Sequence, residues 1–180
     1  SHTYLENRVL SGYDFVDNDA DPSDGHYHGT HVAGTIVDVT LNMPDNVKIL
    51  PVRVLNARGS GSSSVVAAGI RYAADNGADV INLSLGGGHS NSVDEAVRYA
   101  SEKGSLCVAA AGNDDEDAGS SCPAHVSEAL TVGAVDSNEE KAYFSNYGSV
   151  VELCAPGVDI LSCTPNGGWR TLSGTSMAAP

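Results

Sequence analysis

The chain has 180 residues, a length typical of one domain with an ordinary hydrophobic core. Its 23 acidic side chains outnumber its 9 basic ones, and a net charge of −14 would repel nucleic acid phosphates and anionic lipids. No apolar stretch approaches the roughly 20 residues that cross a bilayer. We therefore expect one domain over 1–180, with neither nucleic acid nor membrane partners.

The first distinctive segment is acidic. "YDFVDNDADPSD" places Asp14, Asp17, Asp19, Asp21 and Asp24 in one loop. Clustered carboxylate oxygens suit Ca²⁺, which takes 6 to 8 oxygen ligands. The segment is not an EF-hand, because it lacks the central glycine and the closing glutamate. A solvated acidic turn remains the alternative.

A histidine-rich segment follows. "DGHYHGTHVAGT" carries His26, His28 and His31 around a Gly-Thr pair. These imidazoles could be zinc ligands of a hydrolase, a catalytic base with two bystanders, or loop histidines without a role. The small residues from His28 onward favour a helix that packs close to a neighbour.

From Val47 the chain alternates apolar runs with helical patterns. Strands are predicted at 47–55, 79–88 and 105–113, with helices at 62–77 and 90–104. Such βαβ units build an α/β fold with a parallel sheet and helices on both faces. In these sheets the ligand site lies beyond the carboxyl ends of the strands, which here are the glycine-rich stretches 84–88 and 110–114.

Helix boundaries also show in this region. Ser92 and Glu95 have the spacing of a capping box at a helix start. Gly77 and Gly104 stand where helices usually end.

The remaining segments are short. Asp114–Asp117 is expected to be a solvated acidic loop, and further strands are predicted at 129–135, 150–157 and 158–163. The closing "GTSMAAP" is typical of a helix that begins rather than ends.

The cysteines allow several pairings. Cys107 and Cys154 interrupt apolar runs, so we expect them to be buried thiols. Cys122 and Cys163 lie in or beside loops, and they could form a disulfide only if their α-carbons came within about 7 Å.

Three residues suit acyl-transfer chemistry, which needs a nucleophile, a base and donors for an oxyanion. Ser176 lies at the start of a predicted helix, where unpaired N–H groups are available. Asn113 follows a strand and could offer its amide in the same cleft. His28 is the candidate base.

Three blocks carry a resemblance to a known family. "HGTHVAGT", "SLGGG" followed by "VAAAGN", and "GTSMAAP" occur in the order of the subtilisin family of serine proteases, and the chain is most similar to its thermitase and proteinase K branches. The resemblance covers essentially the whole chain. It implies a subtilisin-like fold and a secreted, monomeric serine endopeptidase that cleaves polypeptides through an acyl-enzyme.

The resemblance also implies roles for individual residues. His28 would be the general base, Ser176 the nucleophile and Asn113 the oxyanion amide, with the Ser176 N–H as second donor. His31 would be structural, and His26 has no family role. A metal-hydrolase interpretation leaves the Asn113 and Ser176 blocks unexplained.

Calcium and substrate residues follow from the same resemblance. The acidic loop would bind Ca²⁺ through the side chains of Asp14, Asp17 and Asp19 and the carbonyl of Asp21. An extended peptide would add as a strand along two segments. A pocket walled by 84–86 and 110–113 would favour apolar or aromatic side chains at P1. The peptide-binding residues would be Ser84, Leu85, Gly86, Gly59, Ser60 and Gly61.

The sequence departs from the family pattern in two places. No Asp-Ser/Thr-Gly motif precedes His28, and Asp14 is not a substitute for the family's catalytic aspartate. We therefore expect a peptidase domain truncated at both ends, which folds poorly and is inactive alone. Tyr27 replaces the usual glycine and is expected to narrow the cleft beside His28.

Two other functions stay open. A non-catalytic relative or binding module would explain the missing aspartate, and a tripeptide-releasing exopeptidase would share the same core motifs.

Overall fold

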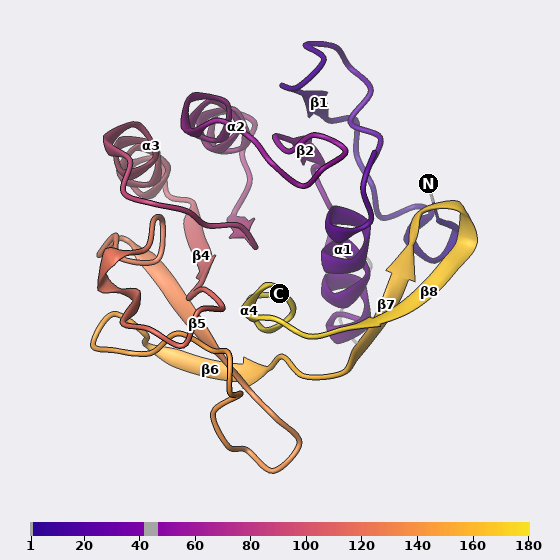
Figure 1. The fold of residues 1–180 in the computed structure, drawn as a ribbon. Helices are drawn as coiled ribbons and strands as arrows, with labels where there is room; N and C mark the ends of the chain where they lie inside the picture. The colour runs from indigo at the N-terminus through magenta and orange to yellow at the C-terminus, as the bar shows by residue number, and fades with distance from the viewer. Residues whose placement is uncertain (1, 42–46) are drawn as a thin grey trace.

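The computed structural model describes residues 2–41 and 47–180. In these residues a parallel sheet has the strand order β3-β4-β5-β6 (Figure 1). Ile81 lies opposite Cys107 in the first strand pair, and Val108 opposite Leu130 in the second. The predicted α/β architecture is therefore confirmed. The strands are β3 (Val80–Leu83), β4 (Leu106–Ala110), β5 (Ala129–Val135) and β6 (Leu153–Pro156).

Helices cover both faces of this sheet. α2 (Ser63–Asp75) and α3 (Asn91–Glu102) pack side by side on one face. α4 (Thr175–Ala178) lies against the other face and contacts α1 (His28–Val39) (Figure 1).

Strand β4 shows why both faces must be covered. Successive side chains of a strand point to opposite faces. Cys107 and Ala109 join the core formed with α2 and α3, whereas Val108 and Ala110 join the core that includes Ala178 of α4. An apolar residue at every position is the pattern of a strand buried on both sides.

Smaller elements flank the sheet. β1 (Tyr13–Asp14) pairs in parallel with β2 (Val52–Arg53), and β7 (Ile160–Thr164) pairs antiparallel with β8 (Gly168–Leu172). β7 contacts α1, and three short 3₁₀ turns complete the elements of the described residues. These turns are Thr3–Leu5, Ala118–Ser120 and Pro165–Gly167. Strand β8 was not predicted from the sequence, although the Pro-Asn-Gly run before it is a hairpin signal.

One helix start differs from the prediction. The N-cap of α3 is Ser90, and its hydroxyl lies 3.0 Å from that of Ser92 without capping the helix. The capping box predicted at Ser92 and Glu95 is therefore wrong, because the helix begins at Asn91. Gly77 and Gly104 do follow α2 and α3 with φ of 76° and 90°, as helix-ending glycines should.

All four cysteines are free thiols. Cys107 is buried as expected, and Cys122 and Cys163 are buried without forming a disulfide. The expectation for Cys154 is wrong, because this residue is exposed on β6, an edge strand of the sheet. In the described part of the chain, no helix has the length and apolarity to span a bilayer.

Candidate active site

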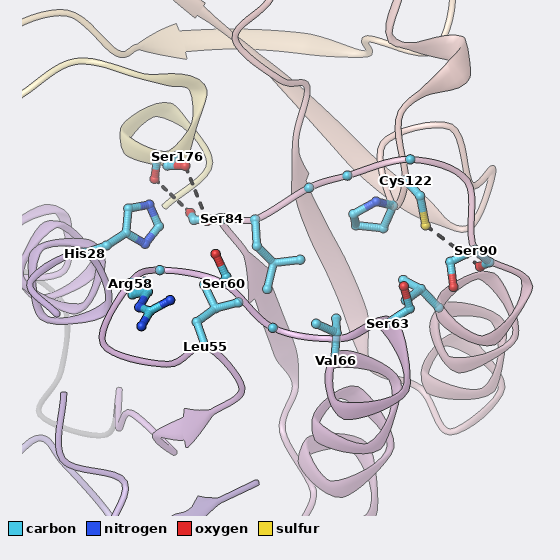
Figure 2. A pocket seen from close by; sticks show the side chains of 18 of the residues that line it. His28, Leu55, Arg58, Ser60, Ser63, Val66, Ser84, Ser90, Cys122 and Ser176 are labelled. Carbon is cyan, nitrogen blue, oxygen red and sulfur yellow. Dashed lines mark hydrogen bonds between the residues drawn. The ribbon is translucent and has the colours of Figure 1, made fainter. Parts of the chain in front are cut away.

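Ser176 lies in the first turn of α4 and faces the carboxyl end of β3 (Figure 2). The Ser84 hydroxyl donates to the Ser176 carbonyl oxygen at 2.7 Å. The Ser176 hydroxyl donates to the Ser84 carbonyl oxygen at 3.3 Å, a long and weak hydrogen bond. The pair fixes α4 against the sheet and leaves the Ser176 hydroxyl easy to redirect.

His28 is the first residue of α1 and comes from the other side of the same cavity. Its turn is fixed by Asp24, which accepts hydrogen bonds from the backbone N–H and the hydroxyl of Thr30 at 2.8 and 2.7 Å. Figure 2 shows the imidazole beside Ser176. Among the described residues, no hydrogen bond joins the two side chains, and none joins the His28 ring to a carboxylate.

The environment of His28 favours the neutral ring. Burial lowers its pKa below the usual 6.5, and the neighbouring His26 and His31 lower the pKa further. The negative charge of Asp24 works in the opposite direction without cancelling the shift. A neutral imidazole can accept a proton, which is what a general base requires.

The Asn113 side chain has a defined orientation. Its Oδ1 accepts hydrogen bonds from the backbone N–H of Thr175 at 2.7 Å and from the Thr175 hydroxyl at 2.9 Å. A backbone N–H can only donate, so the amide atom that it meets must be the oxygen. The amide nitrogen is therefore left to point elsewhere, and Asn113 and Ser176 line the same cavity.

Sequence reasoning missed Thr175. Its side chain is fully buried, and its hydroxyl also accepts the Gly112 N–H at 3.1 Å. Thr175 thus joins the loop after β4 to α4. Its position directly before Ser176 in "GTSM" was the available signal.

Two cavities meet at Ser176. The first, of about 540 Å³, is lined by all six predicted peptide-binding residues together with His28 (Figure 2). The second, of about 560 Å³, is lined by Ala110–Asp114 and Thr175. Leu85–Gly88, here called the glycine strip, lines both. This is the expected site beyond the carboxyl ends of the strands.

Acidic residues also reach the second cavity. Asp114 and Glu116 are exposed, as a solvated loop predicts, yet both belong to the lining. The pocket wall predicted at 84–86 and 110–113 therefore lacks two acidic residues that also line this cavity. Tyr27 lines neither cavity, because its ring stacks on His26 and lies under the Arg170 guanidinium. The predicted narrowing by Tyr27 is not seen.

The three imidazoles of the histidine segment do not converge on one point. His31 is fully buried, and its Nε2 donates to the Arg170 carbonyl oxygen at 2.9 Å. His26, for which the sequence suggested no role, lines the first cavity with His28. This arrangement gives no support to the zinc-hydrolase alternative.

The acidic loop closes on itself and meets Arg53. Backbone hydrogen bonds join Asp14 and Asp19 in both directions. The Arg53 guanidinium contacts Asp14 at 2.5 Å and Asp17 at 2.6 Å. Burial alone would raise the pKa of Asp14, but the Asp17 N–H and Arg53 outweigh it and the pKa is lowered. Asp21 accepts from the N–H and hydroxyl of Ser23.

Comparisons with known proteins agree with this geometry. The model of the subtilase family matches residues 2–180. The chain is 48% identical to an alkaline serine exoprotease A of Vibrio alginolyticus and 49% identical to a thermitase of Thermoactinomyces vulgaris, over essentially its whole length in both cases. A crystal structure of a cold-adapted subtilisin-like serine proteinase superposes with a TM-score of 0.94 at 47% identity, covering all of this chain and 67% of that one.

The chain spans 34% of the Vibrio protein and 67% of the thermitase. Both the family match and the shared fold extend across the three motif blocks and the strands between them. The chain belongs to the subtilase family.

Proposed function

We propose that the protein containing this chain is a serine endopeptidase that hydrolyses peptide bonds through an acyl-enzyme. The observation that carries the proposal is the meeting of Ser176, His28 and Asn113 around adjoining cavities, with Thr175 fixing the Asn113 amide. These groups supply a nucleophile, a base and an oxyanion donor. Nucleophile and base come from different helices and the amide from the loop after β4.

The reaction begins when the Ser176 hydroxyl turns from the Ser84 carbonyl toward His28. Neutral His28 takes the hydroxyl proton as Ser176 Oγ bonds to the substrate carbonyl carbon. The carbonyl oxygen becomes an oxyanion, which the Asn113 amide and the Ser176 N–H stabilise. His28 then gives its proton to the leaving amine, and water releases the acyl group by the same steps in reverse.

A peptide substrate would lie between the two predicted binding segments. Gly59–Gly61 and Ser84–Gly86 form facing walls of the first cavity, as Figure 2 shows. Backbone pairing with both would bind many sequences. The small residues of 110–113 favour apolar or aromatic P1 side chains, whereas Asp114 and Glu116 limit how far that pocket is apolar.

Three further properties belong to this proposal. Calcium would bind at Asp14, Asp17, Asp19 and the Asp21 carbonyl, where Arg53 is the shared guanidinium partner of Asp14 and Asp17 alone. The protein would be secreted, in line with the exoprotease name of the Vibrio relative. It would act as a monomer.

A fluorophosphonate probe tests the activity. We expect the whole protein to be labelled covalently and Ser176→Ala to remain unlabelled. Ser120→Ala is the matched control, because Ser120 lines the second cavity without a role in the chemistry. Absence of labelling in the parent, or equal labelling of Ser176→Ala, would support the non-catalytic alternative instead.

A further inference from the structure

A second cluster of ionisable side chains lies at the far end of the glycine strip from Ser176. His89 directly follows the strip, Asp94 is in the first turn of α3, and His125 lies before β5. One ligand atom from each lies within 4.8 Å of the others. We infer that His89, Asp94 and His125 form a binding site for a divalent transition metal ion of the zinc class.

The distances fit such an ion. The Asp94 Oδ2 lies 3.2 Å from the His125 Nε2 and 3.7 Å from the His89 Nδ1. Zinc bonds of about 2.0–2.1 Å in tetrahedral geometry place ligand atoms about 3.3 Å apart. The distances from the Asp94 Oδ2 to the two imidazole nitrogens are therefore already close to those of a tetrahedral zinc site. His89 is 62% exposed and has room to close the third distance, between the two nitrogens.

The other nitrogen of each imidazole already has an acceptor. The His125 Nδ1 lies 2.9 Å from the Ser121 carbonyl oxygen, which can only accept, so this nitrogen carries the hydrogen. The His89 Nε2 lies 3.0 Å from the Asn91 Oδ1. Histidines that bind metals commonly donate their second N–H to a carbonyl or carboxylate in this way.

This arrangement leaves two lone pairs facing a carboxylate. When both rings are neutral, the unprotonated atoms are the His125 Nε2 and the His89 Nδ1, and both face the Asp94 Oδ2; a doubly protonated His125 would instead donate its Nε2 hydrogen across the same 3.2 Å. Three acceptors in close proximity repel one another unless a cation lies among them. A metal ion satisfies all three acceptors at once and adds no proton to either ring.

The Asp94 side chain is fixed in an orientation that suits a metal ligand. Its side chain is only 6% exposed, and its Oδ1 receives the Cys122 thiol at 3.3 Å, so the Oδ2 is the atom turned to the imidazoles. Figure 2 places Cys122 at the end of the first cavity, near Ser90. Three protein ligands beside an exposed His89 leave a fourth position for water.

A bound ion would stabilise the glycine strip, which lines both cavities. Gly87 and Cys122 exchange backbone hydrogen bonds of 3.0 and 2.9 Å. The ion would add a second link between the strip, through His89, and the segment of His125. Because it binds only the folded site, it stabilises the fold by RT ln(1 + [Zn²⁺]/Kd), which grows with the logarithm of its affinity.

The test uses Zn²⁺ and the whole protein carrying Ser176→Ala, which prevents self-cleavage. Calorimetric titration at pH 7.5 should give one Zn²⁺ per chain, and the melting temperature should rise with Zn²⁺ and fall with a chelator. Co²⁺ should bind at the same site with the visible absorption of a tetrahedral complex. His89→Gln, Asp94→Asn and His125→Gln should each weaken Zn²⁺ binding at least tenfold.

Two controls make the outcome decisive. His26→Gln removes a histidine that lines the first cavity, and it should leave the Zn²⁺ affinity unchanged. Cys122→Ser keeps a donor to Asp94 and should also retain it. The site is refuted if the parent protein binds no Zn²⁺ at 100-fold excess. It is also refuted if His89→Gln binds Zn²⁺ as tightly as the parent, because this side chain is exposed and its replacement leaves the core intact. These readouts do not depend on peptidase activity, so they stand apart from the proposed function.

Discussion

The orientation of one side chain decides whether Asn113 can serve an oxyanion. Thr175 fixes the amide oxygen with two hydrogen bonds, and the amide N–H is left as the available donor. A donor held before the reaction needs no reorganisation when charge develops. The cost of this arrangement is the burial of the Thr175 hydroxyl, which is offset by its bond from the Gly112 N–H.

Replacing Asn113 by Leu should lower kcat with little change in KM, because the amide acts only on the transition state. We expect a loss of about 10² to 10³-fold, the range measured for this amide in subtilisin, a member of the same family. Steady-state kinetics on a peptide anilide would measure it. Thr175→Val should lower kcat by a smaller factor and Thr175→Ser should restore it. An Asn113→Leu enzyme with unchanged kcat would remove the amide from the mechanism.

The pH profile should respond to the neighbours of His28 in opposite directions. Burial lowers the pKa of His28 most, while the Asp24 charge raises it and the His26 charge lowers it. The acid limb of kcat/KM reports this base, since activity is lost as His28 becomes protonated. We expect Asp24→Asn to move the limb to lower pH and His26→Gln to move it to higher pH. Shifts of the same sign in both variants would contradict this assignment.

At the scale of elements, α1 must approach β7 closely for His28 to reach the cavity. A Cβ at Gly34 would lie 2.3 Å from the Ser162 Oγ and 2.6 Å from the Cys163 Sγ. The Ser162 hydroxyl also donates to the His31 carbonyl oxygen at 2.7 Å. The helix therefore depends on a glycine at this one crossing.

Gly34→Ala should destabilise the protein by about 1–3 kcal/mol, the usual cost of overpacking, despite the better helix propensity of alanine. Gly29→Ala is the matched control in the same helix, because its Cβ would meet nothing closer than 3.7 Å. We expect that change to be neutral or to stabilise by up to about 1 kcal/mol. Urea unfolding compares the two. Equal stabilities of the two variants would show that α1 can shift away from β7.

At the scale of the whole molecule, the net charge of −14 would give the proposed calcium ion a second effect. The five carboxylates of the acidic loop lie in a chain whose like charges repel one another, so a divalent cation would relieve repulsion as well as link the loop. Arg53 already neutralises part of this charge at Asp14 and Asp17.

Removing calcium should lower the melting temperature. Binding to the native state adds about 2.7 kcal/mol at 100 times Kd. A chelator titration followed by calorimetry measures the loss, and Asp17→Asn with Asp19→Asn should abolish the sensitivity. Asp136→Asn, which changes a partly exposed carboxylate that caps a turn elsewhere, should leave the sensitivity intact. If the melting temperature of the parent protein is the same with and without calcium, the proposed calcium site is refuted.

The sequence by itself determined the parallel sheet and most of its boundaries. Apolar runs such as that of β4 and glycines such as Gly77 act locally, through burial and backbone conformation, so their effect can be read along the chain. The three motif blocks likewise indicated His28, Asn113 and Ser176 as the candidate site residues, because each block is continuous. The capping box at Ser92 was predicted from residue spacing, and the burial of Cys154 from the apolar residues around it. Both predictions failed because neither signal shows where the helix starts or whether another element covers the strand.

Only the tertiary structure decided which distant residues meet. The Thr175 bond to Asn113 and the cluster of His89, Asp94 and His125 join segments that carry no mutual signal in the sequence. The same is true of Arg53, which reaches the acidic loop from β2, and of Asp114 and Glu116 at the cavity lining. Hydrogen bonds and charge interactions act over a few ångströms, so they depend on how the folded chain packs rather than on the order of its residues.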